Sequence, residues 1–146
     1  EPDHIAVDET VIQLDDERLV VPALHPEDYG HAADPGRFDG HRSAEMMRLL
    51  GYLRRQLQRL GEQLVFNLDY GDPRPRLLLE RFFRQLQQRG ALRGATAEEG
   101  FSIEEITTQE GAMIYEIIIA PALPIDRIHL TFTNMQGEWR EEVKNV

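Results

Sequence analysis

Metal-ligating side chains gather near the N-terminus of this 146-residue chain. Three histidines and three aspartates share a stretch rich in Gly and Pro: His25, Asp28, His31, Asp34, Asp39 and His41. Imidazole and carboxylate groups are common ligands of transition metals. No pair has a recognised ligand spacing, however, and an aperiodic linker offers no hydrogen bonds to orient the ligands. We therefore expect a solvated linker here, with no metal and no cofactor.

Catalytic chemistry finds equally little support. Neither Ser43 nor Ser102 lies in a nucleophile elbow, and no histidine forms a recognisable nucleophile–base arrangement with them. The paired carboxylates Glu98–Glu99 and Glu104–Glu105 could supply an acid and a base. Acidic side chains in turns and strands more often face water. We expect no catalytic residue and no enzymatic activity.

The stretch RGALRGATAEEGF, residues 89–101, places three glycines among small residues. Glycine-rich loops can bind phosphate through backbone N–H groups. The GxxxxGK[ST] and GxGxxG spacings are both missing, so a connector is the better interpretation. Gly90 would end a helix and Thr96 would open a new turn, because Gly is favoured just past a helix end and Thr at an N-cap. The expected connector residues are Gly90, Gly94, Thr96 and Phe101.

Arginines are the most abundant charged groups in the middle of the chain. Residues 42–93 carry a net charge of +6, whereas residues 1–41 carry −9 and residues 94–146 carry −7. A basic middle between acidic ends suits intermolecular contact, or contact between the blocks within one monomer. Arginines also bind phosphates, so a nucleic-acid-binding module is an alternative. Few aromatic residues accompany them on the polar faces, and the whole chain is acidic at −10.

The elements that would position these groups begin with residues 5–24, which read as two strands around a turn at residues 15–17. Residues 25–42 form the linker. A long amphipathic helix is predicted to start at Ser43, with apolar residues repeating every three or four positions to Leu64. A second helix, residues 75–89, follows a Gly- and Pro-containing break.

Three strands are predicted next, over residues 101–108, 113–123 and 126–135. The β-branched density of residues 113–123 is typical of a strand buried on both faces. No element is expected in the acidic tail, residues 136–146, where Trp139 would be either exposed or an anchor for a neighbour. The predicted core residues are Leu53, Leu57, Leu60, Phe82, Phe83, Leu86, Ile117 and Ile119.

These elements predict an α+β fold with two antiparallel helices on a small mixed sheet and β-prone arms at both ends. The length suits one domain with an adequate core. There is no cysteine and no apolar run near the roughly 20 residues that span a bilayer. We divide the chain into an N-terminal arm and linker (1–42), an α+β domain (43–135) and a C-terminal tail (136–146).

Residues 45–133, about three fifths of the chain, resemble the C-terminal domain of contractile tail sheath proteins from bacteriophages and related injection particles. The similar features are a helix ending in Val65–Phe66, an Asn- and Pro-containing loop, a second helix and a GAL-x-GAT-x-EE-x-F connector. The segment YEIIIAPALPIDRIHLTFT, residues 115–133, is similar to the family's last two strands. The connector is the most specific part of the match.

The resemblance implies a non-enzymatic structural subunit that polymerises by lending extended arms to a neighbour's sheet. It implies a virion tail or tail-like particle, assembled in the bacterial cytoplasm, as the location. Neighbouring copies or homologous sheath subunits would be the partners, with inner tube or baseplate proteins in addition and no membrane contact. We expect the charged contact surface to include Arg48, Arg54, Arg55, Arg81, Arg84 and Trp139.

Two departures from the family pattern keep an alternative open. The large N-terminal portion that is usual in sheaths is absent from these residues, and the segment after Phe132 is longer than expected. A baseplate wedge protein of the lysozyme-like type, whose fold is implied to be similar, is therefore a second candidate within the same machine.

Overall fold

The structure is a computed structural model that describes residues 9–22, 35–64, 74–123 and 126–145. Its elements, in chain order, are β1 (Glu9–Leu14), β2 (Glu17–Pro22), α1 (Pro35–Leu64), α2 (Arg74–Gln88), α3 (Ala97–Gly100), β3 (Phe101–Thr107), β4 (Met113–Ile119), β5 (Ile128–Met135) and β6 (Glu138–Asn145). The predicted α+β class is confirmed.

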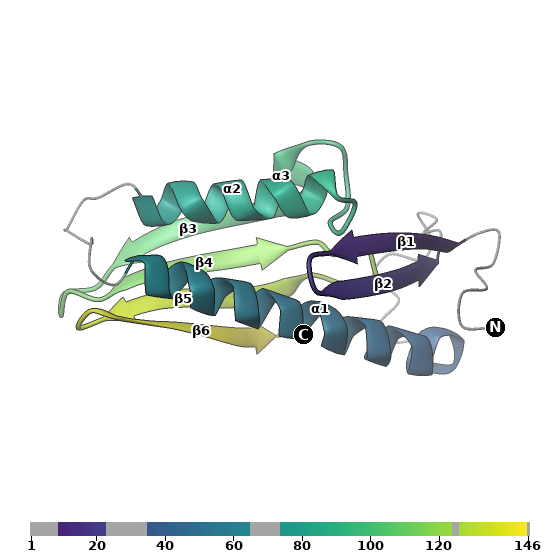
Figure 1. The fold of residues 1–146 in the computed structure, drawn as a ribbon. Coiled ribbons are helices and arrows are strands. Elements are labelled where there is room, and N and C mark those ends of the chain that lie inside the picture. The colour runs from purple at the N-terminus through teal and green to yellow at the C-terminus, as the bar shows by residue number, and fades with distance from the viewer. Residues whose placement is uncertain (1–8, 23–34, 65–73, 124–125, 146) are drawn as a thin grey trace.

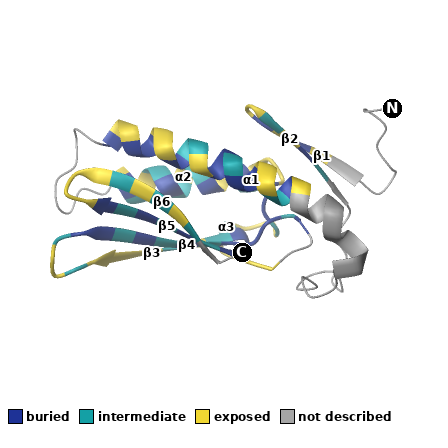
Figure 2. Cartoon of the chain, turned by 90° about the horizontal axis from the view of Figure 1, so that it is seen from below, coloured by how far each residue is buried: buried dark blue, intermediate teal, exposed yellow. Residues whose placement is uncertain are grey.

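A four-stranded sheet with the order β3-β4-β5-β6 forms one layer, and β1 and β2 form a separate hairpin. Helices α1 and α2 run antiparallel to each other and cover the same face of the sheet (Figure 1). No described element packs on the opposite face, as both views show (Figures 1 and 2). Every described strand pair is antiparallel, so the sheet is a meander rather than the mixed sheet expected.

The core lies between the sheet and the helices, where alternate strand residues meet the apolar stripes of α1 and α2 (Figure 2). Burial alternates along β4, so this strand is covered on one face and not on both. Seven of the eight predicted core residues are buried: Leu53, Leu57, Leu60, Phe83, Leu86, Ile117 and Ile119. Phe82 is half-buried and packs against the edge of this core.

Helix α1 begins earlier than the sequence pattern predicts. Its first residue is Pro35, eight positions before the cap predicted at Ser43. Proline is favoured in the first turn of a helix because its fixed φ suits the turn and its missing N–H has no partner there. Gly36 and Gly40 are weak helix formers and obscured this start. Helix α2 agrees with its predicted range to one residue at each end.

The N-terminal hairpin belongs to the core of its own chain. Ile12, Leu14 and Leu19 are buried in the cluster that also contains the apolar face of α1. The backbone N–H of Val20 donates to the buried carboxylate of Glu45 on α1 at 3.0 Å. The two strands predicted within residues 5–24 are therefore confirmed as a hairpin, which packs on its own chain.

The C-terminal tail is also structured, contrary to the sequence-based expectation. Residues Glu138–Asn145 form β6, which pairs with β5 after a turn at Gln136–Gly137. Trp139 stacks on Phe132 with ring centroids 4.5 Å apart. Gly61 of α1 lies so close that an added Cβ would stand 2.8 Å from the Trp139 Cβ. Trp139 is therefore half-buried and anchors β6 beneath α1.

Candidate interaction surfaces

The connector between α2 and β3 is built by its small residues. Gly90 and Gly94 have φ of +89° and +84°, a region that favours glycine. An added Cβ at Gly94 would also lie 2.3 Å from the Glu99 Cβ. The Gly90 helix end and the Thr96 N-cap are confirmed, and Thr96 forms a capping box with Glu99. Phe101 then turns towards the core, with its ring 5.8 Å from that of Phe83.

A carboxylate of the chain itself occupies the place where an anion could bind in this connector. Glu99 Oε1 accepts hydrogen bonds from the backbone N–H groups of Thr96 and Ala95 and from the Thr96 hydroxyl, at 3.1, 3.3 and 2.9 Å. The Thr96 hydroxyl and then these N–H groups lower the pKa of Glu99. Glu99 therefore caps a turn, which explains the connector without a bound phosphate.

Four of the basic side chains in the middle of the chain pair with acids of the described chain, among them Arg76 with Glu80 at 3.5 Å on α2. Arg55 binds Asp16 at 3.0 Å and Glu17 at 3.4 Å, in the turn of the hairpin. Arg89, at the end of α2, binds Asp15 at 3.1 Å. Arg48 pairs with Glu45 at 2.7 Å. Some of the basic residues in the middle of the chain thus pair with acidic residues of the same monomer. Arg48 and Arg55, both predicted to contact a neighbour, are among them.

The ion pairs of Arg55 and Arg89 with the hairpin turn are joined by a hydrogen bond between a hydroxyl and a carboxylate. Together we call these contacts the hairpin clasp. Tyr52 Oη donates to Asp15 Oδ2 at 2.6 Å. Burial and the hydrogen bond to Asp15 raise the pKa of Tyr52 to about 12. The same hydrogen bond, followed by Arg89, lowers the pKa of Asp15. The hairpin turn is therefore fixed by charged and polar contacts to both helices.

Three of the predicted contact arginines, Arg54, Arg81 and Arg84, point to solvent, as does Arg59, which is not among the predicted contacts. Arg54, Arg59, Arg81 and Arg84 are exposed and have no ion pair or hydrogen bond within the described part of the chain. On α2, Arg81 and Arg84 lie on the face opposite the buried Leu79 and Phe83. Leu77, 55% exposed, shares this outward stripe because residues four and seven apart lie on one side of a helix.

The uncovered face of the sheet carries an acidic row that crosses all four strands. Glu104 faces Glu116, Glu116 faces Thr131, and Thr131 faces Glu142 in consecutive strand pairs. Strands lie about 4.8 Å apart, so the row is roughly 14 Å long. Like charges directly opposite each other destabilise a sheet. Glu116 has an interaction within the described chain, whereas Glu104 and Glu142 have no ion pair or hydrogen bond there.

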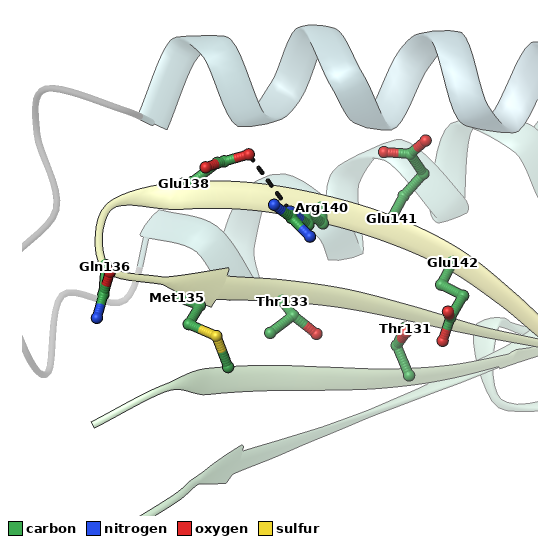
Figure 3. Close-up of a pocket in the computed structure, with 8 residues that line it drawn as sticks. All are labelled: Thr131, Thr133, Met135, Gln136, Glu138, Arg140, Glu141 and Glu142. Atoms are coloured by element: carbon green, nitrogen blue, oxygen red, sulfur yellow. Dashed lines mark hydrogen bonds and ion pairs between the residues drawn. The ribbon is translucent and has the colours of Figure 1, made fainter. Parts of the chain in front are cut away.

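The side chains next to this row include apolar residues, threonines and one exposed ion pair. Ile106 faces Ile114 in the next row of side chains. Thr131, Thr133, Met135 and Glu142 line a shallow pocket of about 360 Å³ on β5 and β6 (Figure 3). Arg140 pairs there with Glu138 at 3.3 Å, but both side chains are more than two-thirds exposed. Such exposed pairs contribute little to stability.

The sheet also has two edge strands, β3 and β6. At β3, Arg76 Nη2 donates to the carbonyl of Ile103 at 3.2 Å, so the backbone of Ile103 faces away from β4. Backbone groups of an antiparallel edge strand alternate between the neighbouring strand and the open side. Glu105, two residues further on, therefore also directs its backbone N–H and carbonyl to the open edge.

Sequence reasoning missed the acidic row and the hairpin clasp, because both depend on strand register and on contacts between distant segments. It also missed Glu45, whose place in a helix gave no sign of burial. His25, Asp28 and His31 lie outside the described residues. Within the described ranges, no three His, Asp or Glu side chains are placed to hold a metal ion. None of the helices in those ranges has the length and apolar character needed to cross a membrane.

Comparison of the chain with protein-family models, with curated proteins and with solved structures found no match.

Proposed function

We propose that this protein is a structural subunit of a contractile tail sheath or a phage-tail-like injection machine, where copies associate by β-strand exchange. The observation that carries the proposal is the pair of edge strands, β3 and β6, each of which pairs with only one strand among the described residues. An open edge presents unpaired N–H and carbonyl groups that a strand from another chain can bind. The resemblance of residues 45–133 to the sheath domain gives the association its biological setting.

Strand exchange fits the position of β6 at the edge of the sheet and at the end of the described chain. A β6 strand from a neighbouring copy could make the same contacts with β5 while linking two chains, which is the usual logic of domain swapping. A strand from another chain could also pair directly with β3, without replacing any strand of this chain. The backbone N–H and carbonyl of Glu105 already face that open edge. The baseplate wedge alternative uses the same edges and differs in the partner.

Nucleic-acid binding is the second candidate, and the exposed Arg54, Arg59, Arg81 and Arg84 favour it. Against it, the uncovered face is acidic and Phe83 is buried rather than available for stacking on bases. Retention on a DNA or RNA column that falls steeply with salt would support this candidate. A chain that passes through such columns at low salt would exclude it.

The experiment that tests strand association replaces Glu105 with proline. Proline removes the N–H that faces the open edge, and it is tolerated in edge strands. We expect Glu105→Pro to keep the circular dichroism spectrum of the wild type and to lose its higher-order species in sedimentation velocity. Glu105→Ala, which keeps the N–H, should associate normally. Association of the proline variant at wild-type strength would exclude the β3 edge.

A further inference from the structure

We propose that the acidic row on the uncovered sheet face binds the outward stripe of α2 in a second copy of this chain. The row consists of Glu104, Glu116 and Glu142, and the stripe consists of Leu77, Arg81 and Arg84. This contact is separate from the strand exchange proposed above, because it uses faces rather than edges. Either one can hold while the other fails.

Charge complementarity identifies the occupant. Arg81 and Arg84 have no ionic partner in the described part of their own chain, and neither have Glu104 and Glu142. Glu104 lies directly opposite Glu116, which already has an interaction within its own chain, so the free charges that a guanidinium group would pair with are those of Glu104 and Glu142. The chain thus carries both halves of one ionic contact on different surfaces.

The sizes and the apolar content of the two surfaces agree with this pairing. Leu77 and Arg84 are seven residues apart, which is about 10 Å along a helix, and the row of carboxylates is roughly 14 Å long. Leu77 is 55% exposed at one end of the stripe, and Ile106, 37% exposed, lies in the row of side chains next to the carboxylates. An apolar contact can therefore accompany the ion pairs.

The arrangement has a consequence for the assembly. Helix α2 lies on one side of the sheet (Figures 1 and 2), and its stripe points away from the buried residues of that helix. The acidic row lies on the other, less buried face of the strands. Contact between two different surfaces is heterologous, so each copy still presents a free surface after binding. Copies would stack helix layer on sheet, in a ring or an open-ended filament.

A charge exchange between two variants tests the contact. Arg81→Glu/Arg84→Glu makes the stripe acidic, and Glu104→Arg/Glu142→Arg makes the row basic. Each variant alone then opposes like charges, so we expect its association constant to fall by about 100-fold or more in sedimentation at low salt. An equimolar mixture should regain wild-type association, because every mixed contact pairs opposite charges. Glu62→Arg/Glu110→Arg, with the same change in charge on segments that carry neither the row nor the stripe, should associate like the wild type.

All four substituted residues are exposed, and recovery in the mixture would itself show that both variants are folded. Failure of the mixture to recover would overturn the proposal, as would wild-type association of either variant alone or a monomeric wild type. If both charge variants associate normally while Glu105→Pro does not, strand association stands and the face contact is rejected. If only the charge variants fail, the face contact stands and the β3 edge is excluded.

Discussion

At the scale of single residues, the hydroxyl of Tyr52 joins the hairpin to α1 through Asp15. Because its pKa is raised from 10.0 to about 12, the folded state holds this proton more tightly than the unfolded state does. The resulting stabilisation is complete below pH 10 and is lost as the pH rises through 12.

Tyr52→Phe should therefore lower the free energy of unfolding at neutral pH by about 0.5–1.5 kcal/mol, the usual net value of a hydrogen bond. The variant should also lose less stability than the wild type between pH 10 and pH 12. Urea denaturation followed at several pH values measures both effects. Parallel stability curves for the two proteins would show that the hydroxyl does not hold the hairpin.

The two adjacent phenylalanines of α2 allow a matched comparison. Phe83 is fully buried, whereas Phe82 is half-buried at the margin of the core, against Tyr52. Phe83→Ala should cost about 3–5 kcal/mol, in line with other buried aromatic truncations. Phe82→Ala should cost less, because Phe82 is only partly buried at the margin of the core. Equal losses in chemical denaturation would contradict the assigned orientation of the helix.

At the scale of elements, the hairpin decides whether the N-terminal segment is an arm or part of the domain. Deletion of residues 1–22 removes Ile12, Leu14 and Leu19 from the core. Each buried aliphatic side chain contributes about 1.5–3 kcal/mol, and a whole domain is stable by only about 5–15 kcal/mol. We expect the truncated chain to be largely unfolded by circular dichroism.

Point variants of β1 provide the control for this deletion. Leu14→Ala, at a fully buried position, should lower the melting temperature, whereas Val11→Ala, at a 36% exposed position, should change it little. A stable, folded chain without residues 1–22 would restore the interpretation of the hairpin as an arm.

Elements with a clear apolar period were predictable from the sequence, as α2 and β5 show. The start of α1 was not, because Gly36 and Gly40 weaken the helical signal while Pro35 initiates the helix. The strand β6 was missed because its inward positions alternate Trp139, Glu141 and Val143, and Glu141 breaks the apolar pattern. In the structure, Glu141 accepts a hydrogen bond from Gln58 of α1 at 3.1 Å. A contact between distant segments thus replaces the apolar contact that a local pattern would show.

The same reason limits what could be predicted of the interaction surfaces. The connector followed from local preferences, since Gly90, Gly94 and Thr96 act within a few residues of their own positions. The ion pairs of Arg55 and Arg89 with the hairpin form only when distant segments pack together. The alignment of Glu104 with Glu116 depends on the register between β3 and β4. The charge blocks indicated that acidic and basic segments meet, but not which arginines remain exposed.

At the scale of the whole molecule, the described elements cover one face of the sheet, leave its other face bare and leave β3 and β6 as edge strands. Soluble monomers usually protect edge strands because open edges invite association. Here, association is the proposed purpose of these edges. The acidic row offers a second surface, because Glu104 and Glu142 have no ionic partner among the described residues.

The most direct test of this account is electron microscopy of the purified chain over a range of protein concentrations. We predict ordered rings, tubes or filaments with a regular repeat, which Glu105→Pro disrupts without unfolding the monomer. Dispersed single chains of 16.8 kDa at every concentration would contradict the assignment of the protein as a self-assembling structural subunit.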